Sequence, residues 1–167
     1  QAAEEVPPTA VGVAIEAAPF ELTVRRARHF EELRPAFYPE EGFRYLALSV
    51  DVTNTTGEPV PAVVLAGAAT LDALGLRTTG LSSGPRTNDP TVVRTADGLT
   101  QRTFQPGLTT TVVLVWQQDL GESPPAEVAV SLGGHTLRRS AMDGSTGWRD
   151  PEPVAVVALP LETLPEQ

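Results

Sequence analysis

Apolar and polar residues alternate most clearly in the segment FRYLALSVDVT, which begins at Phe43. An extended chain places every second residue on the same face, so this segment predicts a strand with one face on a core. Tyr45 and Asp51 fall on the other, more polar face. A second alternating run, Thr109–Gln117, predicts a strand that is buried on both sides. The residues that we expect to form the core of these two strands are Leu46, Leu48, Val50, Val52, Val112, Leu114 and Trp116.

Weaker patterns predict further strands on both sides of these two. Phe20–Arg25 alternates as a half-buried strand, and Val11–Ile15 is expected to form a short edge strand. Ala62–Leu71 is expected to be a strand, with Leu76–Thr79 returning beside it. The segment HFEELRPAFYPEEG predicts a helical turn at Phe30–Arg34, which the following prolines end.

The second half of the chain continues the pattern of short strands and turns. Leu99–Phe104 predicts a weak strand, and a hairpin is expected around Gly133 and Gly134, between Glu127–Leu132 and Thr136–Ser140. A turn-rich segment then precedes a last strand near Val154–Leu159. About eight or nine short strands separated by turn signals are typical of an all-β, immunoglobulin-like antiparallel β-sandwich.

Composition agrees with this fold class and indicates one domain. The 167 residues are rich in Val and Thr, which suit a pleated surface, and 16 Pro and 14 Gly leave little room for long helices. We expect a single sandwich domain over residues 11–167. Residues 1–10, QAAEEVPPTA, are small, acidic and proline-bearing, and are expected to be a flexible tether.

Charge and residue usage narrow the classes of function. A formal net charge of −9 disfavours binding to nucleic acid and to anionic membrane surfaces. All 12 basic residues are Arg, which rules out lysine chemistry, and the absence of Cys removes disulfides and thiolate ligands. Since no apolar run has the length of a membrane span, we expect contact with a membrane only through an anchor or signal segment upstream of the tether.

Four segments together resemble a known bacterial family. They are the strand and turn VDVTNTTGEPV that contains Asn54, the hairpin Thr70–Gly75, Phe104–Gly107 followed by TTTVVLV, and a short closing strand. In this order they resemble a family of actinobacterial secreted and lipoprotein domains of unknown function, which is related to a mycobacterial secreted immunogenic protein. The resemblance covers roughly Val11 to Leu161. It implies an exported immunoglobulin-like domain of the cell envelope and supplies no catalytic residues.

Two features could suggest an enzyme. Gly80–Gly84 matches the G-x-S-x-G nucleophile pattern, but Pro85 and a polar segment follow Ser82 where the pattern requires a helix. His29 and His135 are the only imidazoles, and neither has a second ligand or an acidic partner at useful spacing. The expectation is therefore no enzymatic activity and no cofactor, with a hydrolase using Ser82 kept as the remaining alternative.

Charged pairs offer no established metal pattern. Glu31-Glu32 and Glu40-Glu41 could supply oxygen ligands to calcium, but the spacing of a calcium loop is absent, so no metal site is predicted. Asp51 could pair with Arg44, and Asp150 with Arg149. Such pairs are expected to be surface charges.

Aromatic residues outside the core mark the predicted binding surface. Phe37 and Tyr38 lie between the two acidic pairs, an apolar centre with a charged rim that suits a protein contact, and Trp148 lies among turn residues. With the segments His29–Gly42 and Gly80–Gly98, both expected to be loops, they are the candidates for the binding surface. The alternatives are that Phe37 and Tyr38 cap the core and that Trp148 plugs one end of the sandwich. The predicted function is a non-enzymatic, extracytoplasmic module that binds another envelope or secreted protein. Binding of a small ligand or glycan by the same aromatic residues is the alternative.

Overall fold

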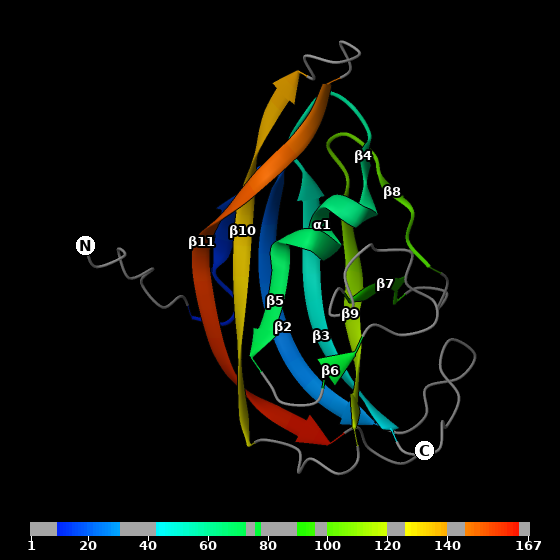
Figure 1. Ribbon diagram of the computed structural model, residues 1–167, viewed down its shortest axis with the longest axis vertical. Helices are drawn as coiled ribbons and strands as arrows, with labels where there is room; N and C mark the ends of the chain where they lie inside the picture. The colour runs from blue at the N-terminus through cyan, green and yellow to red at the C-terminus, as the bar shows by residue number, and fades with distance from the viewer. Residues whose placement is uncertain are drawn as a thin grey trace.

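The computed structural model describes residues 10–30, 43–72, 76–77, 90–95, 100–119, 126–139 and 146–163. Within these ranges the chain forms eleven strands and one short helix (Figure 1). The predicted all-β fold is confirmed. The described ranges contain no helix with the length and apolar character needed to cross a membrane.

One layer of the fold is built from the three most regular strands. β2 (Phe20–Phe30), β3 (Phe43–Asn54) and β9 (Thr109–Asp119) pair antiparallel, with β3 in the centre. The edge strand that we predicted at Val11–Ile15 forms as β1 (Ala14–Ala17) and pairs with the first half of β2. The strands that alternation predicted at Phe20–Arg25, from Phe43 onward and at Thr109–Gln117 are therefore confirmed.

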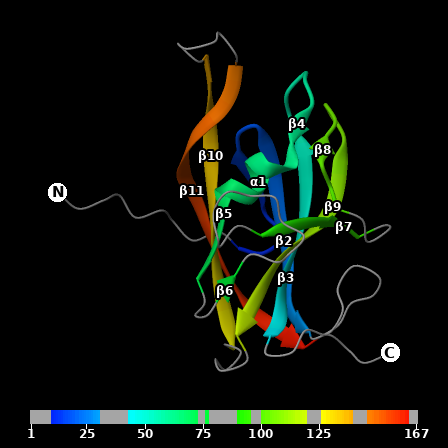
Figure 2. The same cartoon turned by 45° about the vertical axis from the view of Figure 1, so that its right-hand side comes forward.

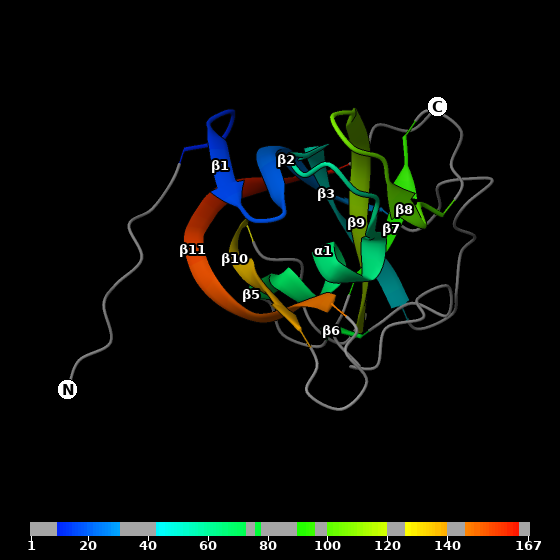
Figure 3. The same cartoon turned by 90° about the horizontal axis from the view of Figure 1, so that it is seen from above.

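The opposite layer consists of β5 (Ala69–Asp72), β10 (Glu127–Arg139) and β11 (Thr146–Thr163). β11 pairs antiparallel with β10 over most of its length, and its last residues then pair parallel with β2. The two layers are thus one curled sheet, which is visible from above in Figure 3 and from the side in Figure 2. The sheet is mixed, whereas we predicted a wholly antiparallel one.

Shorter strands complete the architecture. β4 (Val60–Pro61) and β8 (Thr103–Phe104) form a separate small pair. β6 (Leu76–Arg77) and β7 (Thr91–Arg94) both pair with β9. β6 was expected beside the strand that precedes it, and β7 lies inside Gly80–Gly98, which we expected to be a continuous loop. Both expectations were wrong. β6 and β7 pair with the edge of the buried strand β9 that β3 does not occupy.

The predicted core is confirmed residue by residue. The seven core positions that we named on β3 and β9 are at most 1 % exposed, and Trp116 is fully buried. On β2, Phe20, Leu22 and Val24 join the same cluster. The outward face carries a second, smaller apolar cluster, in which Phe30 stacks on Tyr45 with ring centroids 5.4 Å apart. Tyr45 therefore lies on the face we predicted, but is buried there.

The segment expected to be a strand at Ala62–Leu71 begins as a helix. α1 covers Ala62–Ala68, and only the following residues are strand β5. α1 contacts β10, β11 and β7, and its buried face includes Leu65 and Ala66. A short apolar run has the same appearance in a buried helix and in a buried strand, and packing between the layers decides the outcome here.

The expected hairpin at Gly133 and Gly134 is also absent, because β10 continues through both glycines and pairs with β11. Glycine suits position 134 because neighbouring residues approach its backbone closely. A Cβ there would lie 3.3 Å from Val154 Cγ1 and 3.7 Å from Ala17 Cα. β11 begins at Thr146, well before the expected start at Val154, and includes the segment that we expected to be turn. Leu99–Phe104 yields only the two residues of β8.

Asn54 ends β3 and is completely buried. Its Nδ2 donates to the carbonyl oxygens of Glu58 (2.7 Å) and Phe104 (2.9 Å), while its Oδ1 accepts from the backbone N–H and the hydroxyl of Thr56. Its own carbonyl accepts from the N–H of Gly107 (2.9 Å), whose φ of 74° favours glycine. The turn predicted after β3 is confirmed, and Asn54 joins it to β8 through its side chain and to the turn before β9 through its backbone carbonyl.

We predict that Asn54→Ala lowers the free energy of unfolding by about 2 kcal/mol, because the buried carbonyl of Phe104 and two partly buried groups, the carbonyl of Glu58 and the N–H of Thr56, lose their partner. The neighbouring Thr55 is exposed, and Thr55→Ala should cost less than about 1 kcal/mol. Urea denaturation of both variants measures the difference. Equal losses for the two substitutions would contradict a structural role of the Asn54 amide.

Candidate functional site

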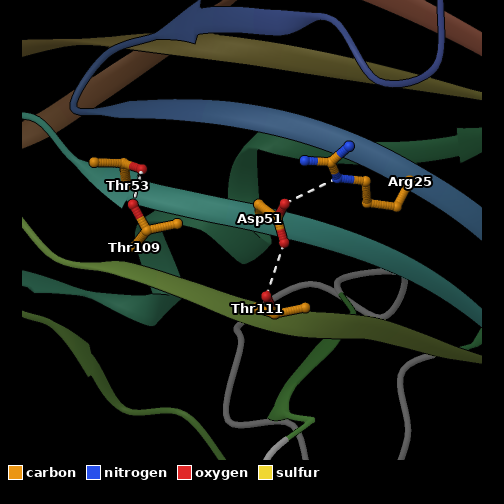
Figure 4. A network of polar contacts seen from close by, with 5 residues as sticks. All are labelled: Arg25, Asp51, Thr53, Thr109 and Thr111. Atoms are coloured by element: carbon orange, nitrogen blue, oxygen red, sulfur yellow. Dashed lines mark hydrogen bonds and ion pairs between the residues drawn. The ribbon is translucent and has the colours of Figure 1, made fainter.

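A group of polar side chains that hydrogen-bond in two neighbouring sets lies on the outward face of β2, β3 and β9. It consists of Arg25, Asp51, Thr53, Thr109 and Thr111, which we call the polar strip (Figure 4). Arg25 donates from Nε to Oδ2 of Asp51 over 2.8 Å, and Thr111 donates to Oδ1 over 2.8 Å. The hydroxyls of Thr53 and Thr109 lie 2.7 Å apart.

Strand pairing explains why these side chains meet. Asp51 is directly opposite Thr111 and Thr53 is directly opposite Thr109 in the β3–β9 register. Side chains of opposite residues in an antiparallel pair point to the same face and are close enough to hydrogen bond. The backbone ladder therefore places the two pairs on β3 and β9 side by side, while Arg25 reaches Asp51 from the irregular part of β2.

Asp51 is the electrostatic centre of the polar strip. The hydrogen bond from Thr111 holds the pKa of Asp51 below its usual value, with the Arg25 guanidinium acting in the same direction and partial burial opposing both. Its side chain is 24 % exposed and that of Arg25 is 54 % exposed. A stabilised carboxylate is a poor proton donor at neutral pH. The arrangement suits recognition through charge and hydrogen bonds better than acid–base chemistry.

Most of the predicted binding residues lie outside the described residues. Phe37, Tyr38, Ser82 and both acidic pairs are in this position, so the structure does not test them. The backbone of Trp148 is described and lies in β11, opposite Leu137. The expectation that Trp148 belongs to a turn is therefore wrong, and its predicted binding role stays a prediction. The described residues include no group of three metal-ligating side chains.

The two histidines lie in strands. His29 is in β2, opposite Leu46. Its pKa is lowered mainly by burial and further by the nearby Arg44 guanidinium. His135 was expected in a turn but lies in β10, where its backbone N–H donates to the backbone carbonyl of Ala18 over 2.7 Å. Burial lowers the pKa of His135, whose Nδ1 has no hydrogen-bond partner.

Sequence reasoning identified Asp51 but assigned it the wrong partner. Arg44 instead donates to Oε1 of Gln118 over 2.7 Å, and Asp51 binds Arg25. The signal for Arg25 was present in the sequence VRRA, where two polar residues separate Val24 from Ala27. That spacing breaks the alternation of β2, and the structure has a register shift at this point.

Comparison with known proteins identifies structural neighbours only. No protein-family model matches the chain, and no curated protein sequence matches it. An uncharacterized β-sandwich protein from Clostridium difficile 630 is similar in structure, with a TM-score of 0.53, 15 % identity, and coverage of 95 % of this chain and 98 % of the other. A "putative lipoprotein" from Staphylococcus aureus gives a TM-score of 0.50 and 10 % identity, over 96 % of this chain and 100 % of the other.

At these identities the likeness concerns the fold, and it shows that this chain is a β-sandwich of a kind found in other bacterial proteins. The resemblance drawn from the sequence is supported to that extent. Its narrower part, the relation to actinobacterial domains and a mycobacterial secreted protein, receives no support from these neighbours and stays a prediction.

The lowered pKa values of the two histidines predict that the free energy of unfolding rises with pH. Their pKa values are lowered in the folded state, so the unfolded chain binds protons first as the pH falls below about 6.5. Their contribution to stability is present above that pH and is lost as the pH falls through the lower folded-state pKa. We expect the His135→Gln variant to lose less stability than the wild type between about pH 7 and 5.

Urea denaturation across this range measures the difference, and an NMR titration of the His135 ring tests its cause directly. A folded-state pKa at or above the ordinary histidine value would contradict the prediction. His29→Gln provides the matched comparison, because burial lowers the pKa of both rings while Arg44 acts on His29 alone.

Proposed function

We propose that this chain is a non-enzymatic binding module that acts outside the cytoplasmic membrane, and that its partner is another envelope or secreted protein. The observation that carries the proposal is the polar strip. It is an accessible array of donors and acceptors fixed on the face of a rigid sheet. Such a surface loses little conformational freedom on binding, which favours recognition of a second macromolecule.

The proposed location rests on the kind of protein that shares the fold. One structural neighbour is described as a "putative lipoprotein", and lipoproteins are held at the membrane surface through a lipid. The tether predicted over residues 1–10 suits attachment of the domain to an upstream anchor. Both arguments favour the cell envelope as the location, where another envelope or secreted protein would be met.

The absence of enzymatic activity is part of the proposal and predicts the outcome of a direct assay. The purified protein should turn over no ester, peptide or glycoside substrate. Ser82→Ala should leave the free energy of unfolding and every binding property unchanged, because the sequence after Ser82 lacks the helix that a nucleophile elbow requires. Turnover that disappears in Ser82→Ala would overturn this part of the proposal.

Partner binding is tested by photo-crosslinking in intact cells of the source organism. A photoreactive residue at position 109 or 38 should capture a protein, identified by mass spectrometry and then purified. Calorimetry with that protein should show about tenfold weaker binding for Thr109→Arg, Tyr38→Ala and Trp148→Ala. Thr70→Arg on β5 is the matched control, since Thr70 and Thr109 are both exposed strand threonines.

The outcomes separate the proposal from its alternative. Wild-type affinity in all three variants would place the binding surface elsewhere and refute the assigned residues. Capture of a glycan in place of a protein, with loss of binding confined to Tyr38→Ala and Trp148→Ala, would support glycan recognition by the aromatic residues.

A further inference from the structure

The irregularity in β2 places two consecutive arginines on one face. Val24 and Ala27 are both buried in the main core, at 1 % and 2 % exposure, although they are three residues apart. The register shift between them accommodates an extra residue, so that Arg25 and Arg26 both lie off the core. Their side chains are 54 % and 49 % exposed. We call these two residues the arginine pair.

A carboxylate contacts each member of the arginine pair at the same atom. Nε of Arg25 lies 2.8 Å from Asp51, which Thr111 fixes in place, and Nε of Arg26 lies 3.6 Å from Glu162 on β11. Both contacts are made at Nε, and Figure 4 shows the contact between Arg25 and Asp51 leaving from Nε. No described residue hydrogen-bonds the terminal nitrogens of either arginine.

The local charge favours an anion although the whole chain is acidic. Arg28 lies opposite the outward-facing Ala47 and beside Glu162, so three arginines lie near two carboxylates, those of Asp51 and Glu162. The next carboxylate along this face of β2 is Glu21, which is four residues from Arg25 and lies opposite Thr53. Charges beyond about 8 Å are largely screened at physiological ionic strength. A small bound anion therefore experiences this local excess of positive charge. A long polyanion would also contact the remaining surface of a chain with net charge −9.

We propose that the arginine pair is the docking point for an acidic segment of the partner protein, and that it binds carboxylates through the terminal guanidinium nitrogens. Two nitrogens in one plane match the two oxygens of a carboxylate, which gives a bidentate contact. The exposed hydroxyls of the polar strip lie beside the pair and can bond the backbone of the same segment. This inference rests on the proposed function and specifies the chemistry of the partner.

The test uses the intact protein and a short labelled peptide with two adjacent glutamates. Fluorescence anisotropy should show binding that weakens with salt, and NMR should show shifts at the Nε–H resonances of Arg25 and Arg26. The same peptide with glutamines should not bind. Arg25→Gln or Arg26→Gln should weaken binding about tenfold, the loss expected for one charge-assisted contact. Arg102→Gln, at an exposed arginine outside this face, should have no effect.

Equal binding of the glutamine peptide, or an equal loss in Arg102→Gln, would overturn the inference. Tighter binding of inorganic phosphate or of phosphatidylglycerol vesicles than of the glutamate peptide would overturn it in favour of phosphate recognition. The inference alone fails if Thr109→Arg disrupts the captured complex while Arg25→Gln and Arg26→Gln bind the partner with wild-type affinity. The proposed function alone fails if the peptide binds as expected but crosslinking captures no protein.

Discussion

The buried amide of Asn54 is the constraint on which the arrangement of the long strands depends. Three segments that are distant in sequence, the turn after β3, strand β8 and the turn before β9, all hydrogen-bond to this one residue. A buried polar group is costly unless it is fully paired, so any shift of β9 along β3 would leave several groups unsatisfied. The register of β3 and β9 in turn places Asp51 opposite Thr111 and creates the polar strip.

The strands with strict alternation could be predicted from sequence because one buried face determines their register. Every core residue named on β3 and β9 is buried. Segments whose state depends on packing could not be predicted. Ala62–Ala68 is a short apolar run that fills the space between two layers as a helix. The two glycines of β10 resemble a turn in sequence, yet the strand continues through both, and Gly134 allows Ala17, Ala18 and the side chain of Val154 to approach its backbone.

Prolines explain the other large error, the length of β11. Pro151, Pro153 and Pro160 argue against a central strand, since proline supplies no backbone donor. β11 tolerates them because over most of its length it pairs with β10 on one side, and it joins β2 only at Leu161–Thr163.

Of the candidate site, Asp51 could be placed on the outward face by alternation, but its partner could not, because Arg25 reaches it only through the irregularity in β2.

The parallel pairing of β11 with β2 has a consequence for how the chain folds during synthesis. Leu161 pairs with Ala27, so the curled sheet closes by joining segments separated by almost every other strand. Contacts between distant segments form late, because the entropy of closing a long loop must be overcome first. Until β11 has left the ribosome, the second half of β2 keeps an open hydrogen-bonding edge. The curled sheet can therefore close only after residues 161–163 have been synthesised and have left the ribosome.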